Sequence, residues 1–209
     1  MTARLILVLL AGGATAAAGE TIDRVVVVVG RQVITDSEIR LQSRITAFLN
    51  GETPDVSGPA RRKTAERLIE QALLGREIEL ARFPWAEPLE AEKMFREIGA
   101  ARFKSEEQFR AALADCRIED EQLKQALVWQ LTVLRFVDFR FRAAIHIPEA
   151  NIQARYGKLY PDGKGPKLEE IRTKLEKMLT DERVDQALDG WLRDARAQAR
   201  IEIRGESFQ

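Results

Sequence analysis

The sequence has very few of the residues on which disulfide bonds, zinc sites and thiol or imidazole catalysis depend. Its 209 residues include a single cysteine, Cys116, and a single histidine, His146. One cysteine cannot close a disulfide within the chain, and these two residues are too few for a structural zinc site. Nothing in the sequence places His146 beside Cys116, so we expect packing or capping roles for both. We accordingly expect no metal ion and no cofactor.

An excess of charge of either sign is also missing. Lysine and arginine together number 33, and aspartate and glutamate together also number 33. A nucleic-acid-binding protein needs a concentrated basic face, so this balance argues against nucleic acid as a partner. Acidic pairs such as Glu169-Glu170 lie in first turns or on solvated faces of charged helices, where carboxylates are ordinary. With no catalytic constellation in the sequence, we predict that the protein is not an enzyme.

Long apolar runs are scarce, and the one that stands out lies near the start of the sequence. Arg4 is followed by the apolar run Leu5 to Ala11 and then by small residues that suit a signal peptidase. This order is typical of a secretory signal peptide. The alternatives are a buried amino-terminal helix or an uncleaved anchor, but the run is too short to span a bilayer comfortably. We predict a cleaved signal peptide at residues 1–18 and no stable membrane insertion.

The most informative segment runs from Ile22 to Ile39. Val25 to Val29 are all valine, which predicts a strand covered on both faces, and Gly30 breaks it before a second short strand at Val33-Ile34. Thr35 and Glu38 have the spacing of a capping box that begins a helix. The only other convincing strand candidate is Arg200 to Arg204, so we predict that one small sheet joins the two ends of the chain.

Helical patterns fill the sequence between these strands. The predicted helices begin at Thr35, Ala60, Pro88, Ser105, Glu119, Glu149 and Leu168, and the last extends to about Ala199. The second and third helices are separated by Phe83-Pro84-Trp85. The polar segment Gly157 to Lys167 is rich in glycine, proline and lysine and predicts a flexible or tightly turned connector. The fold class is therefore mainly α, with a small β-sheet.

The fifth predicted helix, about Glu119 to Ile145, differs from the others because it is apolar on two sides. Leu127 and Leu131 lie on one stripe, and Trp129 and Phe136 lie on a roughly opposite one. The helix is either central to the core or has one side lining a groove that a partner fills. The candidate peptide-binding residues are Trp129, Phe136, Phe139, Phe95, Phe103 and Phe109.

The order of these segments resembles one known family. The segment TIDRVVVVVGRQVITDSEIRLQ resembles the start of the mature SurA-type periplasmic chaperones, and RRKTAERLIEQALLGREIELA resembles their second helix. FKSEEQFRAALADCRIEDEQLKQAL, AAIHIPEANIQARY and LEEIRTKLEKMLTDERVDQALDGWLRDARAQARIEI resemble the segments that follow. The resemblance implies a multi-helix, SurA-like peptide-binding domain in which the carboxy-terminal strand joins the amino-terminal strands.

One departure from the family concerns activity. Relatives usually carry one or two parvulin-type prolyl isomerase domains between the counterparts of Tyr156 and Leu168, where this chain has only residues 157–167. We therefore expect a helical domain at 19–156, a connector at 157–167, and a returning helix and strand at 168–209, without isomerase activity. The resemblance implies an ATP-independent periplasmic chaperone for unfolded outer-membrane or exported polypeptides. The alternative is an exported structural or assembly subunit that docks one defined partner.

Overall fold

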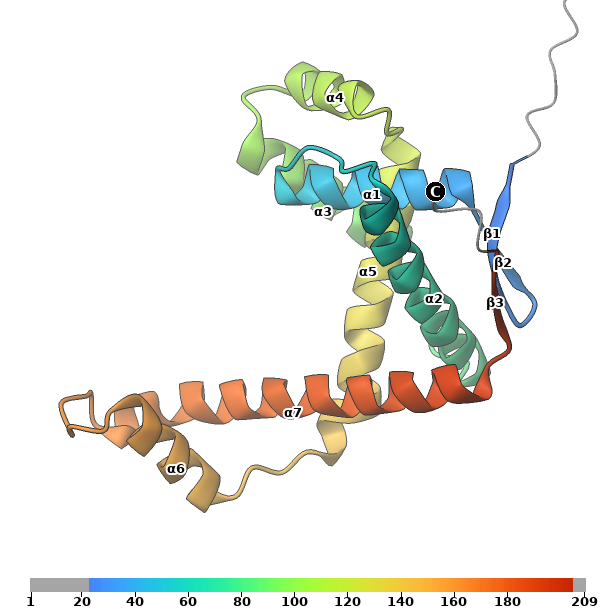
Figure 1. Cartoon of the computed structure of the whole chain (residues 1–209). Helices are drawn as coiled ribbons and strands as arrows, with labels where there is room; N and C mark the ends of the chain where they lie inside the picture. Colours follow the sequence, from blue (N-terminus) through green and yellow to red (C-terminus); the bar gives the residue numbers. More distant parts are fainter. Residues whose placement is uncertain (1–22, 205–209) are drawn as a thin grey trace, which may run out of the picture.

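The computed structural model describes residues 23–204, which form a mainly helical fold with one small antiparallel sheet (Figure 1). The predicted signal peptide at 1–18 lies outside these residues. The strands are β1 (Val25–Val29), β2 (Gln32–Thr35) and β3 (Ile201–Ile203). The helices are α1 (Asp36–Asn50), α2 (Gly58–Leu80), α3 (Pro88–Arg102), α4 (Glu106–Asp115), α5 (Asp120–Phe141), α6 (Glu149–Leu159) and α7 (Leu168–Gln198), and a 3-10 turn, η1 (Arg142–Ala144), follows α5.

The sheet brings the two ends of the described chain together, as the sequence predicts. Its strand order is β2-β1-β3, and both pairings are antiparallel. Gly30 has a φ of 59° at the first position of the two-residue turn between β1 and β2, a conformation that costs glycine nothing. The Gly30 N–H also donates to the carbonyl oxygen of Arg200, at 2.8 Å, so the turn fixes the entry to β3.

Helices cover one face of the sheet rather than two. Val27, Val29 and Ile34 are buried in a core cluster with residues of α2, while the outer face carries Val33, which is 43% exposed. The expectation that Val25–Val29 is covered on both faces is confirmed in part. No residue of β1 is exposed, and Val26, at the irregularity in the strand, is fully buried, but Val28 on the outer face is only half-buried.

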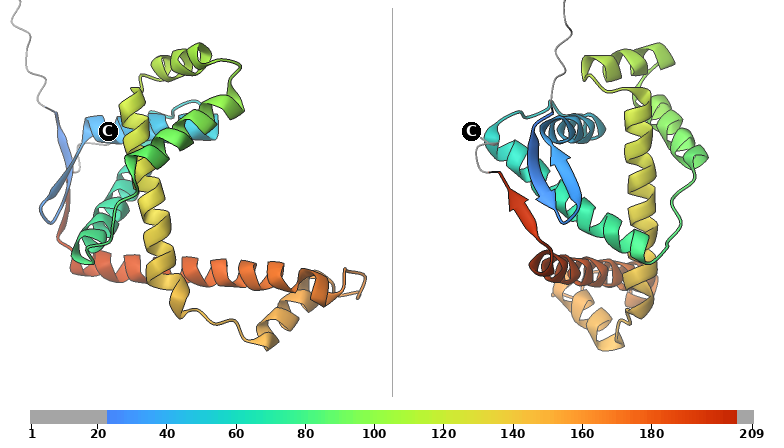
Figure 2. Two further views of the ribbon diagram at one scale, coloured as in Figure 1. Left: turned by 180° about the vertical axis from the view of Figure 1, so that it is seen from behind. Right: turned by 90° about the vertical axis from the view of Figure 1, so that its right-hand side faces the viewer.

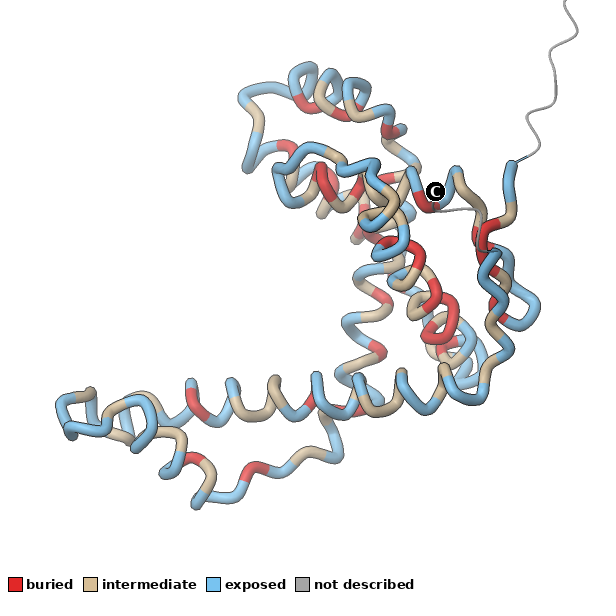
Figure 3. The backbone as a smooth tube through the Cα atoms, in the orientation of Figure 1, coloured by how far each residue is buried: buried red, intermediate tan, exposed pale blue. Residues whose placement is uncertain are grey.

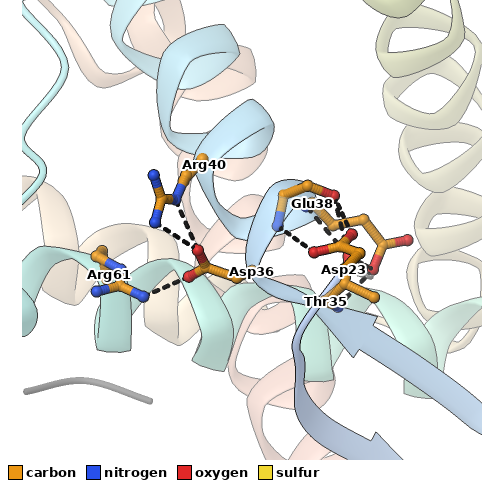
Figure 4. A network of polar contacts seen from close by, with 7 residues as sticks. Asp23, Thr35, Asp36, Glu38, Arg40 and Arg61 are labelled. Atoms are coloured by element: carbon orange, nitrogen blue, oxygen red, sulfur yellow. Dashed lines mark hydrogen bonds and ion pairs between the residues drawn. The ribbon is translucent and has the colours of Figure 1, made fainter. Parts of the chain in front are cut away.

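Polar contacts fix the junction between β2 and α1 (Figure 4). The predicted capping box is confirmed: the Thr35 hydroxyl accepts from the Glu38 N–H, and the Glu38 carboxylate accepts from the Thr35 N–H at 2.7 Å. Next to it, the Asp36 carboxylate pairs with both Arg40 and Arg61, which ties the first turn of α1 to α2. These contacts fix the positions of the end of β2 and the first turns of α1 and α2 relative to one another.

The remaining helices form a body around α5. Ile45 and Phe48 of α1 meet Phe95 of α3, Phe109 of α4 and Leu127 of α5 in the largest aromatic part of the core. Further along α5, Phe136 is fully buried among α2 and α7. Figure 2 shows α5 extending from the α3–α4 end of the molecule to α7. Its central position confirms that both sides of this helix are used in packing.

The far half of α7 and the whole of α6 extend from this body as a helical hairpin (Figures 1 and 3). Its small core contains Ile147, Ile152 and Leu175. Helix α6 continues to Leu159, so the first three residues of the predicted connector are helical. The remaining turn is tight rather than loose, because the Tyr156 hydroxyl donates to the Pro166 carbonyl oxygen at 2.9 Å and Gly165 lies so close to the Tyr160 ring that a Cβ would overlap it.

Candidate binding groove

A groove with a volume of about 820 Å³ lies between the β1–β2 hairpin and α2. Leu68, Ala72 and Leu73 of α2 form its apolar floor. Leu41 of α1 lies at one side. The walls are completed by residues 29–34 of the hairpin, by residues 198–200, and by two tryptophans.

The two tryptophans stand at the end of the groove away from the hairpin. Trp129 belongs to α5 and is partly buried, whereas Trp85 belongs to the segment between α2 and α3 and is 48% exposed. Their ring centroids lie 5.9 Å apart. Gly75 of α2 faces the Trp129 ring, and a Cβ at this position would meet the ring at an ordinary contact distance of 3.6 Å. The pair provides a large apolar surface with a polar N–H on each ring.

A buried hydrogen bond positions Trp85. The neighbouring Ala86 is buried, and its N–H donates to the Thr132 hydroxyl of α5 at 2.9 Å. The same hydroxyl donates to the Val128 carbonyl oxygen at 2.7 Å. Because the Ala86 N–H is bonded to a side chain of α5, the segment that carries Trp85 is anchored to α5.

A second apolar hollow adjoins the groove and shares Trp85 with it. It lies over α3 and α5, has a volume of about 610 Å³, and includes Leu89 and Val128. Leu89 is largely exposed. Glu92 and Lys124 form an ion pair at its polar side, at 2.6 Å. Trp85 therefore stands between two hollows that together run from the hairpin to α3.

The ionisable groups have the electrostatics of surface ion pairs. The Lys124 ammonium lowers the pKa of Glu92, and the Arg172 guanidinium does the same for Glu149. For Asp23 the Ser37 hydroxyl lowers the pKa by bonding to the charged carboxylate. Every resolved shift within residues 23–204 favours the charged form, whereas a general acid working near neutral pH needs a raised carboxyl pKa.

Among residues 23–204, no group of three or more histidine, cysteine, aspartate or glutamate side chains is placed to hold a metal ion. Within the same residues, no helix combines the length and the apolar character needed to cross a membrane.

The six predicted contact residues divide between the core and the surface. Phe95, Phe109 and Phe136 are buried and serve as core residues, so their assignment as contacts with a partner is wrong for this conformation. Their rings fill the interior because they lie on helix faces that meet other helices. Phe103 is half-buried and stacks on the Phe48 ring, with centroids 6.2 Å apart.

The other two predicted residues remain accessible, but only one of them lines the groove. Trp129 lies in the groove wall. Phe139 is 63% exposed near the end of α5, where its ring lies 5.3 Å from that of Phe83, outside the groove. The groove itself was not predicted from the sequence, because its lining comes from five separate stretches of the chain: 29–42, 68–79, 85, 129 and 198–200. The one available signal was Trp85, an aromatic residue between Pro84 and Pro88 that no helical stripe explains.

No protein-family model matches the chain, and no curated protein sequence matches it.

Proposed function

We propose that this protein is an ATP-independent chaperone that holds unfolded exported polypeptides in the periplasm and keeps them from aggregating. The observation that carries the proposal is the groove of about 820 Å³ with an apolar floor and a tryptophan pair at one end. A groove of this kind suits apolar side chains of another polypeptide, which contribute about 1.5–3 kcal/mol each on burial, before the cost of ordering the chain. A few such contacts would give binding that is useful and reversible.

Two further features support the proposal. Large apolar side chains remain exposed at several places outside the groove, among them Leu89 and Phe139, so a long unfolded chain would find more than one contact. The layout of residues 1–18 is typical of an export signal, which would deliver the protein to the compartment in which unfolded outer-membrane proteins travel. The resemblance to SurA-type chaperones agrees with both.

The test is suppression of aggregation. An unfolded outer-membrane protein is diluted from urea with and without the purified mature chain, in the absence of ATP, and light scattering is followed. We expect suppression by the wild-type chain, less suppression by Trp85→Ser, and unchanged suppression by Leu159→Ser. The two side chains are equally exposed, at 48%, but only Trp85 lines the groove.

Failure of the wild-type chain to suppress aggregation at several-fold molar excess would reject the chaperone function. The alternative function, docking of one defined partner, predicts little affinity for assorted unfolded chains and strong binding of a single protein. Assaying outer-membrane proteins of unrelated sequence separates the two functions, since a chaperone acts on all of them. We expect no acceleration of prolyl isomerisation in a proline peptide.

A further inference from the structure

Strand β2 forms one edge of the sheet, and its outer edge borders the groove. In the pairing of β1 with β3, the Gly30 N–H donates to Arg200 and the Arg204 N–H donates to Val26, so the even-numbered residues of β1 bond to β3. The odd-numbered residues then bond to β2, in the register Val29 with Gln32. The N–H and carbonyl groups of Val33 consequently point away from β1, and no other strand of residues 23–204 pairs with them.

The groove follows this edge. Its lining contains both Val33 and Ile34, which alternate between the outer and the buried face of the sheet. Leu41 of α1, the helix that directly follows β2 and contacts it, also lines the hollow, which places the hollow beside the outer edge of β2. Beneath this edge lie Leu68 and Ala72 of α2, so a chain placed there would have unpaired backbone groups at one side and apolar side chains below it.

We propose that the groove binds an extended segment of an unfolded polypeptide as a fourth strand, paired with β2 through the backbone of Val33. The proposal rests on the function proposed above and specifies how the client is held. A bound helix satisfies its own backbone groups and would leave those of Val33 unpaired, whereas an extended segment pairs with them. Alternate side chains of the segment then face the floor of α2, so the site favours alternating apolar residues.

The same geometry limits the length of the pairing. The next outward N–H along β2 belongs to Thr35, and it already donates to the Glu38 carboxylate at 2.7 Å. Strand addition therefore centres on Val33 and supplies few hydrogen bonds. Most of the affinity comes from side chains in the groove and on the tryptophan pair, which suits a protein that must release its clients.

Charge in the groove selects among possible segments. The lining carries three arginines, Arg31, Arg76 and Arg200, and two glutamates, Glu38 and Glu79, so its formal charge is one positive in excess. Both Arg31 and Arg76 are exposed. A segment with acidic flanking residues is thus complementary to the groove, and a lysine-flanked segment is disfavoured.

A set of N-methylated peptides tests the pairing. The probe is a synthetic peptide of about nine residues that alternates valine or tyrosine with threonine and has aspartate at both ends. Each central amide is methylated in turn, and binding is followed through the fluorescence of Trp85 and Trp129 in a Trp191→Phe background. A methyl group on the peptide amide that donates to the Val33 carbonyl oxygen should weaken binding by about three- to tenfold, whereas methyl groups on the two neighbouring amides, which face away from β2, should be tolerated.

Equal affinity of all methylated peptides would overturn strand addition and leave the chaperone function standing. Absence of binding by any peptide, together with unimpaired suppression of aggregation by Trp85→Ser, would reject the groove as the client site. A lysine-flanked peptide that binds as tightly as the aspartate-flanked one would contradict the charge argument.

The protein offers a matching test at Val33. Val33→Pro removes the outward N–H, a change that edge strands tolerate. It should weaken binding of the unmethylated peptide to about the same extent as one inward methyl group weakens binding to the wild type. Val33→Thr keeps the N–H and should leave binding unchanged. If Val33→Pro fails to fold, hydrogen exchange in the wild-type chain decides: the Val33 amide should become protected when peptide binds, while the Ile34 amide, already bonded to β1, changes little. Protection of Val33 without peptide, appearing only as the chain dimerises, would assign the edge to a second copy and overturn the proposal.

Discussion

At the scale of single residues, the groove depends on side chains that bond to the backbone of another segment. Thr132 is fully buried, and its hydroxyl is both the acceptor for the Ala86 N–H and a donor to Val128. A buried hydroxyl with two backbone partners is well satisfied. Its loss would leave the Ala86 N–H without a partner in the core and free the segment that carries Trp85.

Thr132→Val keeps the shape of the side chain and removes the hydroxyl. We expect the free energy of unfolding to fall by about 1–3 kcal/mol, the usual penalty for a buried donor left unpaired. Urea unfolding measures this loss. Thr132→Ser keeps the hydroxyl and should retain most of the hydrogen-bond contribution. A smaller loss in Thr132→Val than in Thr132→Ser would show that packing of the methyl group, rather than the hydrogen bond, stabilises this position.

At the scale of elements, α3 and α4 pack closely against each other at a glycine. Gly99 of α3 faces the ring of Phe109, and a Cβ at Gly99 would be 2.7 Å from that ring. Phe109 is itself buried against Phe48, Phe95 and Phe103, so it has little room to move. The glycine is thus required for packing, although alanine is the better helix former.

Gly99→Ala should therefore destabilise the protein by about 1–3 kcal/mol, the typical penalty of overpacking, against the gain of about 1 kcal/mol in helix propensity. Gly75→Ala is the matched control, since it lies within α2 and its Cβ would meet Trp129 at an ordinary 3.6 Å. Thermal unfolding of both variants is the measurement. A Gly99→Ala variant as stable as Gly75→Ala would contradict the close packing of α3 on α4.

Much of the order of helices and strands along the chain could be predicted from the sequence, because it depends on local signals. The capping box at Thr35, the serine cap at Ser105 and the strand at Ile201–Ile203 are local patterns, and the structure contains each of them. The second helix begins at Gly58, two residues before its predicted start, because the cap at Ser57 was missed. The groove could not be predicted, since it depends on how far the hairpin stands from α2. The burial of Phe95 and Phe109 was missed for the same reason: helical periodicity shows which face is apolar, not what covers it.

At the scale of the whole molecule, the hairpin of α6 and α7 extends from the body and is held by a few apolar contacts and ion pairs. Glu149 of α6 pairs with Arg172 of α7, and Arg142 joins the end of α5 to Asp181 of α7 at 2.8 Å. Lys177 and Arg142 lower the pKa of Asp181 by bonding to the charged carboxylate, as Arg172 does for Glu149. These pairs therefore contribute stability only while the carboxylates are ionised.

A lowered folded-state pKa fixes the sign of the pH dependence. The contribution of Glu149 is fully present above its unfolded pKa, and it is lost as pH falls below about 4 and the carboxylate takes up a proton. We expect Glu149→Gln to lower the unfolding temperature near neutral pH and to converge with the wild type in acid. Glu170→Gln, which removes an exposed carboxylate of α7 with no ion pair among residues 23–204, should show no such convergence. A constant difference between Glu149→Gln and wild type at all pH values would contradict the ion-pair explanation.

The central claim is that an unfolded polypeptide lies in the groove beside α2. Site-specific photo-crosslinking tests it directly, with benzoylphenylalanine placed at position 85 in the groove or at position 134 on α5. Leu134 is 62% exposed, more than Trp85, and does not line the groove. With an unfolded outer-membrane protein as client, we predict a strong crosslink from position 85 and a weak one from position 134. Equal crosslinking from the two positions would contradict a groove-bound client.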